Sequence, residues 1–336
     1  IGVRRCGKST LCEMFLKQKG IDFAYVNFDD DRMEDMKASD LDHLLEALYM
    51  TYGEFKYLFL DEIQNIEGWP LFVNRLLRQK MHLFITGSNS KLLSKELSTH
   101  LTGRNNKVEL YPFSYSEYCA MKNIDTTSLS TKAKGIRKST LQGGFPELFN
   151  ESNRRGYING LLDAIIKNDI AKRFKVRNVE ALRRIAAYLA DNYCQEFVAK
   201  TVGELFGVSN HTAENYYSYL KEAFLLVGVN RFSYKSKDRV RNEKVYVVDT
   251  AFVTEREDNF SLENLGWKLE NIVCIELMRR YKPLFCDVFY YKETSSQVDF
   301  VIAKDGNVQE LIQVSYDIST EKTRNREIRG LKNAAK

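Results

Sequence analysis

The stretch GVRRCGKST, residues 2–10, opens the chain and decides its fold. It matches the spacing GxxxxGK(S/T), in which the glycines let the backbone bend tightly so that successive N–H groups point inward at a polyphosphate. A helix that starts near Lys8 would direct its positive dipole end at the same charge. The alternative is a chance Gly-Lys-Ser turn in front of a helix. The predicted phosphate-binding residues are Gly2, Arg5, Cys6, Gly7, Lys8, Ser9 and Thr10.

The roles of two of these side chains follow from their chemistry. The Lys8 ammonium can reach the outer phosphates, and the Ser9 hydroxyl can ligate Mg²⁺. A loop of this kind needs a buried strand that leads into it. The chain begins at Ile1 without Met, so we expect that strand to be missing from this sequence, with a cost to stability and to nucleotide binding.

Composition excludes several classes of protein. The chain has 336 residues, enough for two or three domains, and 44% of them are hydrophobic. No apolar run approaches the roughly 18 residues of a membrane span, and no signal-peptide pattern is visible. The six cysteines are scattered without a CxxC motif, which favours reduced thiols in a cytoplasmic protein over a disulfide framework or a zinc site. The net charge of +5 permits contact with nucleic acid without indicating it.

A second motif ends in two carboxylates. Residues 57–62, YLFLDE, place four apolar residues before Asp-Glu, and the lack of polar alternation is typical of a strand buried on both faces. The end of such a strand would deliver Asp61 to the Mg²⁺ shell and Glu62 to the attacking water. A carboxylate in that position can orient and polarise the water for phosphoryl transfer. The alternative is an ordinary strand followed by an acidic turn.

Polar residues follow the next predicted strand, LFIT at 83–86. Ser88 or Asn89 would suit a sensor of the γ-phosphate, and the alternative is a capping turn for a helix from Lys91. Arg104 is a candidate arginine finger in cis or in trans, and the alternative is a plain surface arginine.

Together these motifs carry a resemblance. GVRRCGKST, YLFLDEIQNIEGW, LFITGSNSKLLSKEL, LTGR and VELYPFSYSEY resemble, in order and interval, the AAA+-like P-loop ATPases of bacteria and archaea that carry a C-terminal domain of unknown function. LQGGFPELF and the later segments are similar to the same family. The resemblance implies an α/β core that uses ATP and Mg²⁺, with a parallel sheet of order 5-1-4-3-2 whose first strand is absent here. It places the other strands at 23–28, 57–61, 83–86 and 107–111.

Periodicity and turn residues divide the rest of the chain. Residues 121–140 are polar and are interpreted as a loop or hinge. The residue patterns predict helices over 8–19, 41–52, 69–80, 157–174 and 179–192, and one from Tyr115.

Residues 197–249 resemble a winged helix. Thr201 is expected to cap a short helix over 202–206, residues 207–209 to form the turn, and 210–220 the second helix, with strands at 225–232 and 244–249. The loop between these strands is basic, which suggests contact with DNA phosphates. The alternative is a solvated loop on a protein-interaction module. The second helix is rich in tyrosine and poor in arginine and lysine, which is unusual for a helix that reads a DNA groove. The basic residues are Arg231, Lys235, Lys237, Arg239, Arg241 and Lys244, of which Lys235, Lys237, Arg239 and Arg241 are the candidate DNA contacts.

The last part follows the plan of PD-(D/E)XK nucleases, in which carboxylates hold Mg²⁺ and a lysine stabilises charge. A helix over 267–281 carries Glu270, and strands at 288–291, 298–303 and 310–314 carry Asp299 and the third element. That element reads Gln313-Val314-Ser315, so a carboxylate and a lysine have been replaced, and we predict a nuclease-like fold that has lost catalysis. The final helix, 320–336, is expected to pack on its neighbour.

The sequence thus predicts an ATPase domain at 1–120, a helical linker or lid at 121–178, a winged helix at 179–250 and a nuclease-like domain at 251–336. ATP binding and hydrolysis with Mg²⁺ would drive or switch the C-terminal part. One alternative is an ATP-dependent DNA-binding or DNA-processing protein with residual nuclease activity. Another is a nucleotide-binding regulatory scaffold with little turnover. A protein partner and a homo-oligomer are both open at this stage, and no membrane association is expected.

Overall fold

The structure, a computed structural model, describes residues 1–335 except 90–105, 236–241, 257–263 and 294–295. These residues form two compact units, Ile1–Leu110 and Tyr111–Lys336, which are described separately. Several residues singled out above lie outside the described ones, namely Lys91, Arg104, Lys237, Arg239 and Arg241. None of the described helices has both the length and the apolar character needed to cross a lipid bilayer.

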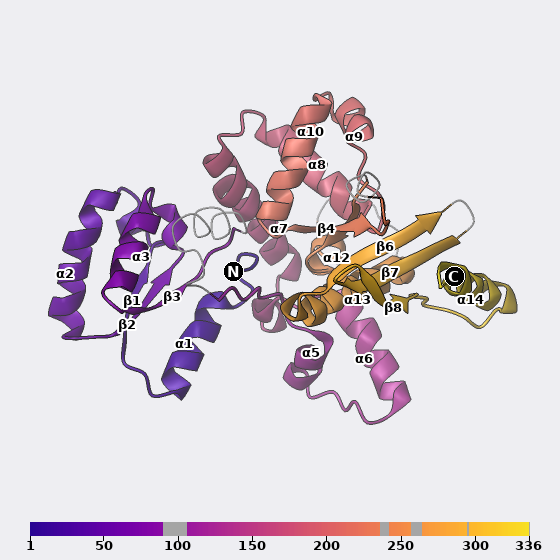
Figure 1. The fold of residues 1–336 in the computed structure, drawn as a ribbon, viewed down its shortest axis with the longest axis horizontal. Helices are drawn as coiled ribbons and strands as arrows, with labels where there is room; N and C mark the ends of the chain where they lie inside the picture. Colours follow the sequence, from indigo (N-terminus) through magenta and orange to yellow (C-terminus); the bar gives the residue numbers. More distant parts are fainter. Residues whose placement is uncertain (90–105, 236–241, 257–263, 294–295, 336) are drawn as a thin grey trace. The chain divides into compact units, whose positions relative to one another are not determined.

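The N-terminal unit is built on a parallel sheet of three strands with β2 in the middle (Figure 1). This arrangement agrees with the part of the sheet that the resemblance implied for these strands. The strands are β1 (Phe23–Asn27), β2 (Tyr57–Asp61) and β3 (His82–Ile85), and the helices are α1 (Lys8–Gln18), α2 (Leu41–Tyr52) and α3 (Trp69–Arg78).

The central strand β2 is buried on both faces, which explains its unbroken apolar run. Leu58 and Leu60 belong to a core that also holds Trp69 and other buried residues of α2 and α3. Phe59 points to the opposite face, where its ring lies 5.1 Å from that of Tyr25. Because side chains alternate across a strand, both sets of apolar residues are needed to cover the sheet.

The strand predicted over 107–111 is wrong, because the described residues 106–111 form no strand. The Ile1 amino group donates to the Val108 carbonyl at 2.8 Å, and the Leu110 N–H donates to the Ile1 carbonyl at 2.7 Å. On the other side, the Gly2 N–H donates to the Gly87 carbonyl at 3.3 Å. The parallel pairing between Ile1 and residues 108–110 is therefore only one residue long, which is too short to form a ladder of hydrogen bonds.

The C-terminal unit combines helices with a five-stranded mixed sheet of order β5-β4-β6-β7-β8 (Figure 1). Its strands are β4 (Leu226–Arg231), β5 (Lys244–Val247), β6 (Asp287–Glu293), β7 (Ser296–Lys304) and β8 (Asn307–Ile312). Its helices are α5 (Tyr115–Met121), α6 (Leu129–Gln142), α7 (Arg154–Ala164), α8 (Val179–Asp191), α9 (Ala199–Phe206), α10 (Asn210–Glu222), α12 (Ala251–Thr254), α13 (Leu265–Tyr281) and α14 (Glu321–Ala334), with a π-helical segment (Ile165–Lys172) that continues α7.

The interpretation of residues 121–140 as a loop or hinge is wrong, because α6 occupies much of this range. The Ser128 side chain caps the helix by accepting from the Thr131 N–H at 3.1 Å. Near the end of the helix, the Ser139 and Thr140 hydroxyls both donate to the Ile136 carbonyl. Polar side chains that return to their own helix can be buried, so composition alone misidentified the segment.

Two further boundaries differ from the sequence predictions. The helix α9 begins at Ala199, so Thr201 lies within it and does not cap it. The next helix, α10, is capped by Ser209, whose side chain accepts from the Thr212 N–H at 3.1 Å. The strand β8 ends at Ile312, which leaves Gln313, Val314 and Ser315 beyond its end. No residue of α14 is buried, although its Gly330 carbonyl accepts from the Ser296 hydroxyl at 3.0 Å.

The outer edge of β5 is covered by side chain and backbone from other segments. Asn271 of α13 accepts from the Val247 N–H at 2.9 Å and donates to the Val247 carbonyl at 2.8 Å. The Val245 N–H donates to the Gln195 carbonyl, and the Val245 carbonyl accepts from the Cys194 N–H. The edge strand of the sheet is therefore hydrogen-bonded on both sides.

We predict that Gly144→Ala destabilises the C-terminal unit by about 1–3 kcal/mol, because overpacking against backbone has costs of that order. A Cβ atom on Gly144 would lie 2.4 Å from the Phe113 carbonyl oxygen, which cannot move aside as a flexible side chain can. Urea unfolding followed by Trp267 fluorescence in a Trp69→Phe background measures the effect.

The matched control is Gly160→Ala in α7, where an added Cβ meets nothing within 4 Å. Replacing a helical glycine by alanine stabilises a helix by up to about 1 kcal/mol. Equal unfolding midpoints for the two variants would show that the close approach at Gly144 does not constrain the fold.

Candidate functional site

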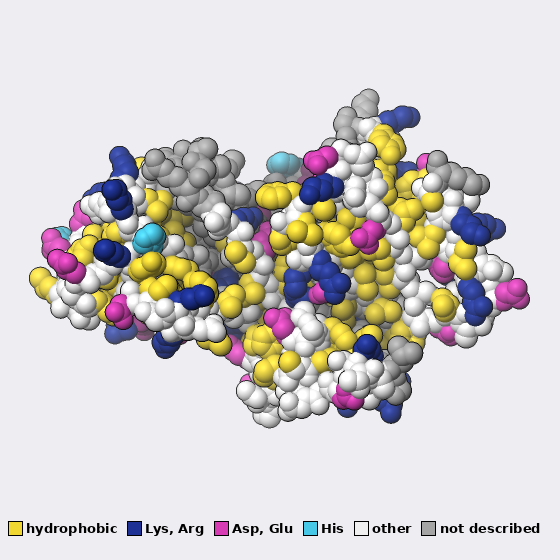
Figure 2. All heavy atoms as spheres, turned by 60° about the horizontal axis from the view of Figure 1, so that its bottom comes forward, with side chains coloured by type: hydrophobic (Ala, Val, Ile, Leu, Met, Phe, Trp, Pro, Cys, Tyr) yellow, Lys and Arg dark blue, Asp and Glu magenta, His cyan; other side chains and the backbone are white. Residues whose placement is uncertain are grey.

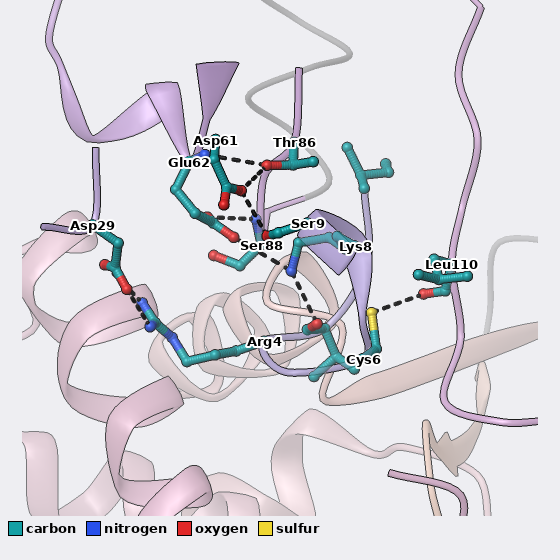
Figure 3. A network of polar contacts seen from close by, with 12 residues as sticks. Arg4, Cys6, Lys8, Ser9, Asp29, Asp61, Glu62, Thr86, Ser88 and Leu110 are labelled. Atoms are coloured by element: carbon teal, nitrogen blue, oxygen red, sulfur yellow. Dashed lines mark hydrogen bonds and ion pairs between the residues drawn. The ribbon is translucent and has the colours of Figure 1, made fainter. Parts of the chain in front are cut away.

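The parallel register of the sheet brings three strand ends to one edge. Asn27 pairs with Asp61, and Leu60 pairs with Ile85, so the residues that follow each strand lie side by side. The helix α1 begins at Lys8, directly after the glycine-containing loop. Figure 3 shows side chains from the loop, α1 and the strand ends pointing toward one another. This edge is where open parallel sheets bind ligands.

The loop backbone takes a conformation that requires glycine. Gly7 precedes α1 with φ of 95° and ψ of 17°, in the left-handed region. A Cβ atom on Gly2 would lie 2.1 Å from the Leu110 carbonyl oxygen, so only glycine fits there. Cys6 is buried with its sulfur 3.5 Å from the same carbonyl, whereas Arg5 and Thr10 are exposed. The two motif glycines thus have separate reasons, one conformational and one steric.

Lys8 is buried at the centre of the site. Its Nζ atom donates to the Val3 carbonyl of the loop at 3.1 Å and lies 3.3 Å from Glu62 Oε1 (Figure 3). The first-turn N–H groups of α1 have no partner within the helix, by helix geometry. The ammonium and the helix N-terminus therefore present positive charge at the same point.

Asp61 accepts hydrogen bonds from three hydroxyl groups. Ser9 Oγ donates at 2.9 Å, and Thr86 Oγ1 forms a further bond (Figure 3). The Tyr25 hydroxyl donates at 3.2 Å. Ser9 and Asp61, which the sequence analysis named as candidate Mg²⁺ ligands, are thus in direct contact. A carboxylate and a serine hydroxyl in contact form an oxygen ligand set of the kind that Mg²⁺ uses beside nucleotide phosphates.

Glu62 is held in an unusual backbone conformation with φ of 54°. Its side chain accepts from the Ser88 N–H at 3.0 Å and from the Gln64 amide. Burial alone would raise the pKa of Glu62, but the Lys8 ammonium, the Gln64 amide and the other donors outweigh it and hold the pKa below its usual value. The carboxylate is therefore ionised at neutral pH.

The candidate sensor residues follow β3. Ser88 and Asn89 are both buried, and Ser88 reaches the site through its backbone N–H to Glu62. The role that the sequence assigned to their side chains stays a prediction, as does that of Arg104.

Sequence reasoning missed four residues of this site. Thr86 donates to Asp61 and accepts from the Glu62 N–H at 3.2 Å, Tyr25 contacts Asp61, and Arg4 forms an ion pair with Asp29 at 2.8 Å. Thr86 directly follows β3, and Asp29 is the second residue after β1. Their positions just after two strands that pair with β2 were the signal in the sequence that could have identified them.

The candidate residues of the C-terminal unit are only partly brought together. Glu270 and Asp299 both lie near Lys244, with Nζ–oxygen distances of 2.6 and 3.9 Å. Gln313 is turned elsewhere, since its Oε1 accepts from the Asp299 N–H at 3.2 Å and its Nε2 donates to Glu327 at 2.7 Å. Ser315 donates to the Asp317 carbonyl.

Lys244 therefore corrects two points of the sequence interpretation. It was counted with the basic loop, but it is buried and does not belong to an exposed cationic surface. The replacement of lysine by Ser315 suggested that the carboxylates lack a nearby cation, and Lys244 supplies one from a different strand.

Comparison with known proteins matches two parts of the chain to separate families. Residues 1–119 match a family described as an AAA domain, and residues 133–261 match a domain of unknown function (DUF8612). An uncharacterized protein of Methanocaldococcus jannaschii is 35% identical over 353 residues, which cover 100% of this chain and 78% of that protein. An uncharacterized protein of Haemophilus influenzae is 33% identical over 333 residues, covering 94% and 82%.

We predict that Thr86→Val destabilises the N-terminal unit by about 1–3 kcal/mol, because it leaves a buried acceptor on Asp61 and the Glu62 N–H without their shared partner. Thr86→Ser keeps the hydroxyl and is the control. Urea unfolding followed by Trp69 fluorescence in a Trp267→Phe background measures both. Equal destabilisation of the two variants would assign the effect to packing of the methyl group.

Proposed function

The chain belongs to the family of proteins that carry an AAA domain followed by this domain of unknown function, and on that premise we propose that it binds and hydrolyses ATP with Mg²⁺. The observation that carries the proposal is the contact of Lys8 and Ser9, from the loop and helix, with Glu62 and Asp61, from the end of β2. This juxtaposition of phosphate-binding and metal-binding groups matches the parts that P-loop NTPases share.

The residues fit the ligands that they are proposed to hold. The loop amides, the N-terminus of α1 and the Lys8 ammonium would bind the phosphates. Ser9 and Asp61 would hold Mg²⁺, which when bound would neutralise charge on the phosphate oxygens. The Tyr25 and Thr86 hydroxyls orient the Asp61 carboxylate by hydrogen bonds.

Glu62 is proposed as the group that positions water and accepts its proton. It is ionised, as a general base must be, and it pairs with Lys8 in this structure. A phosphate that binds the Lys8 ammonium in place of Glu62 would leave a lone pair of the Glu62 carboxylate free to accept a proton from water. Ser88 or Asn89 would respond to the γ-phosphate, because the Ser88 N–H already contacts the Glu62 carboxylate. Arg104 stays a candidate for stabilising the transition state.

The first test is Glu62→Gln, which we predict abolishes ATP turnover while leaving ATP binding in place. The amide keeps the size of the side chain but cannot accept the proton, so the effect falls on kcat. Turnover by phosphate release and affinity by a fluorescent ATP analogue are measured on the same purified protein. Turnover at the parent rate would remove Glu62 from this role.

Lys8→Ala is the matched comparison. It removes a phosphate contact that is present in ground state and transition state alike, so ATP affinity itself is expected to fall. If the protein is instead the alternative regulatory scaffold, the unaltered protein would bind ATP but hydrolyse it little, and Glu62→Gln would not lower the rate of hydrolysis further.

A second candidate function is DNA binding by the C-terminal unit. The observation that favours it is that β4 and β5 pair antiparallel, so the basic residues at 235–241 lie in the connection of a hairpin that follows α9 and α10. On the face seen in Figure 2, basic and acidic side chains are interspersed among the coloured residues, which favours a local contact over a broad cationic surface.

The test replaces the basic hairpin residues by glutamine and measures the affinity for duplex DNA as a function of salt. The slope of log K against log salt is expected to become shallower by about 0.9 for each phosphate that the protein no longer neutralises. An unchanged slope would favour the protein-interaction alternative. The test residues are Lys235, Lys237, Arg239 and Arg241, and the control neutralises the exposed Lys17, Lys19, Lys37 and Lys56.

A further inference from the structure

The carboxylates of the C-terminal unit meet a cation that belongs to the chain. Lys244 Nζ donates to Glu270 Oε1 at 2.6 Å and lies 3.9 Å from Asp299 Oδ1. The Tyr246 hydroxyl donates to the same Glu270 oxygen at 2.8 Å, and the Val314 N–H donates to Asp299 Oδ2 at 2.9 Å. The ammonium therefore contacts the one carboxylate and faces the other.

All three charged groups are largely removed from solvent. The side chains of Lys244, Glu270 and Asp299 are 6%, 12% and 7% exposed. Burying a charge is costly unless an opposite charge and hydrogen bonds compensate it. A scissile phosphate would also need room beside the carboxylates, which this degree of burial does not provide.

The charges influence one another strongly. Burial and then the charge of Glu270 raise the pKa of Asp299 to about 6. Burial would lower the pKa of Lys244, but the Glu270 and Asp299 carboxylates outweigh it, so the pKa lies above its usual value and the amine is charged at neutral pH.

We propose that Lys244 is a built-in cation that takes the place of a divalent metal ion between Glu270 and Asp299. Glu270 Oε1 already accepts from the ammonium and the Tyr246 hydroxyl, and Asp299 Oδ2 accepts from the Val314 N–H, so these oxygen atoms would have to give up a donor to bind Mg²⁺ or Mn²⁺. A metal ion would also be repelled by the buried ammonium. Gln313 does not add a ligand, because both ends of its amide are engaged.

The ion cluster then has a structural role. Lys244 comes from β5, Glu270 from α13 and Asp299 from β7, and β4 and β6 separate the two strands in the order of the sheet. The lysine joins the hairpin of β4 and β5 to the helix and strand that the sequence placed in a nuclease-like domain. On this proposal the cluster of Lys244, Glu270 and Asp299 holds the C-terminal unit together and, without a metal ion, does not hydrolyse DNA.

The experiment measures Mn²⁺ binding by the electron paramagnetic resonance signal of the free ion, without nucleotide, on the full chain. Lys244→Met removes the charge while keeping the length of the side chain, and it is expected to gain one bound Mn²⁺ per chain. That gain should disappear in the double variant Lys244→Met/Asp299→Asn, which is the matched control. Where Lys244 is kept, the single changes Asp299→Asn and Glu270→Gln are expected to leave Mn²⁺ binding as it is in the unaltered protein.

The outcomes separate clearly. A bound Mn²⁺ in the unaltered protein that is absent from Asp299→Asn would overturn the proposal, and so would a folded Lys244→Met protein that gains no metal. If Lys244→Met folds only when Mn²⁺ is present, the metal has replaced the ammonium and the proposal is supported. If it does not fold at all, the comparison of the unaltered protein with Asp299→Asn and Glu270→Gln decides alone.

Discussion

The buried carboxylate of Asp61 is the interaction on which the N-terminal unit depends. It accepts hydrogen bonds from the hydroxyl groups of Ser9, Tyr25 and Thr86. These residues lie in α1, in β1 and directly after β3. A single acceptor thus ties one helix and three adjacent strands at the edge where Lys8 lies. Because a buried carboxylate needs these donors, the same hydrogen bonds that stabilise the fold also fix the orientation of the group proposed to bind metal.

Lys8 and Lys244 are both buried and are paired in different ways. Lys8 lies 3.3 Å from Glu62 and donates to a backbone carbonyl of a loop shaped by glycine, directly before the first turn of α1. Lys244 Nζ lies 2.6 Å from Glu270 Oε1 and 3.9 Å from Asp299 Oδ1, and all three side chains are largely buried. Coulomb attraction is similar in kind at both places. What differs is the set of partners, since Lys8 has one carboxylate and a backbone carbonyl, whereas Lys244 contacts one carboxylate and faces a second.

The sequence predicted the N-terminal unit well because its signals are local. The motif at residues 2–10 and the apolar run of β2 each contain the reason for their own conformation. The mistakes arose where a contact from elsewhere decides the outcome. Residues 107–111 have the composition of a strand but pair with only Ile1, and the polar α6 is stabilised by bonds within the helix. Lys244 follows a basic loop in sequence, and only the tertiary fold turns it inward.

The covered edge of β5 has a consequence for self-association. An edge strand with free N–H and C=O groups can recruit a strand from another molecule and start aggregation. Here the amide of Asn271 imitates a neighbouring strand at Val247, and residues 194–195 do the same for Val245. The strand therefore offers no open template at these positions. A four-residue strand with the sequence KVYV, apolar apart from Lys244, can then lie at the margin of a sheet without making the protein prone to intermolecular pairing.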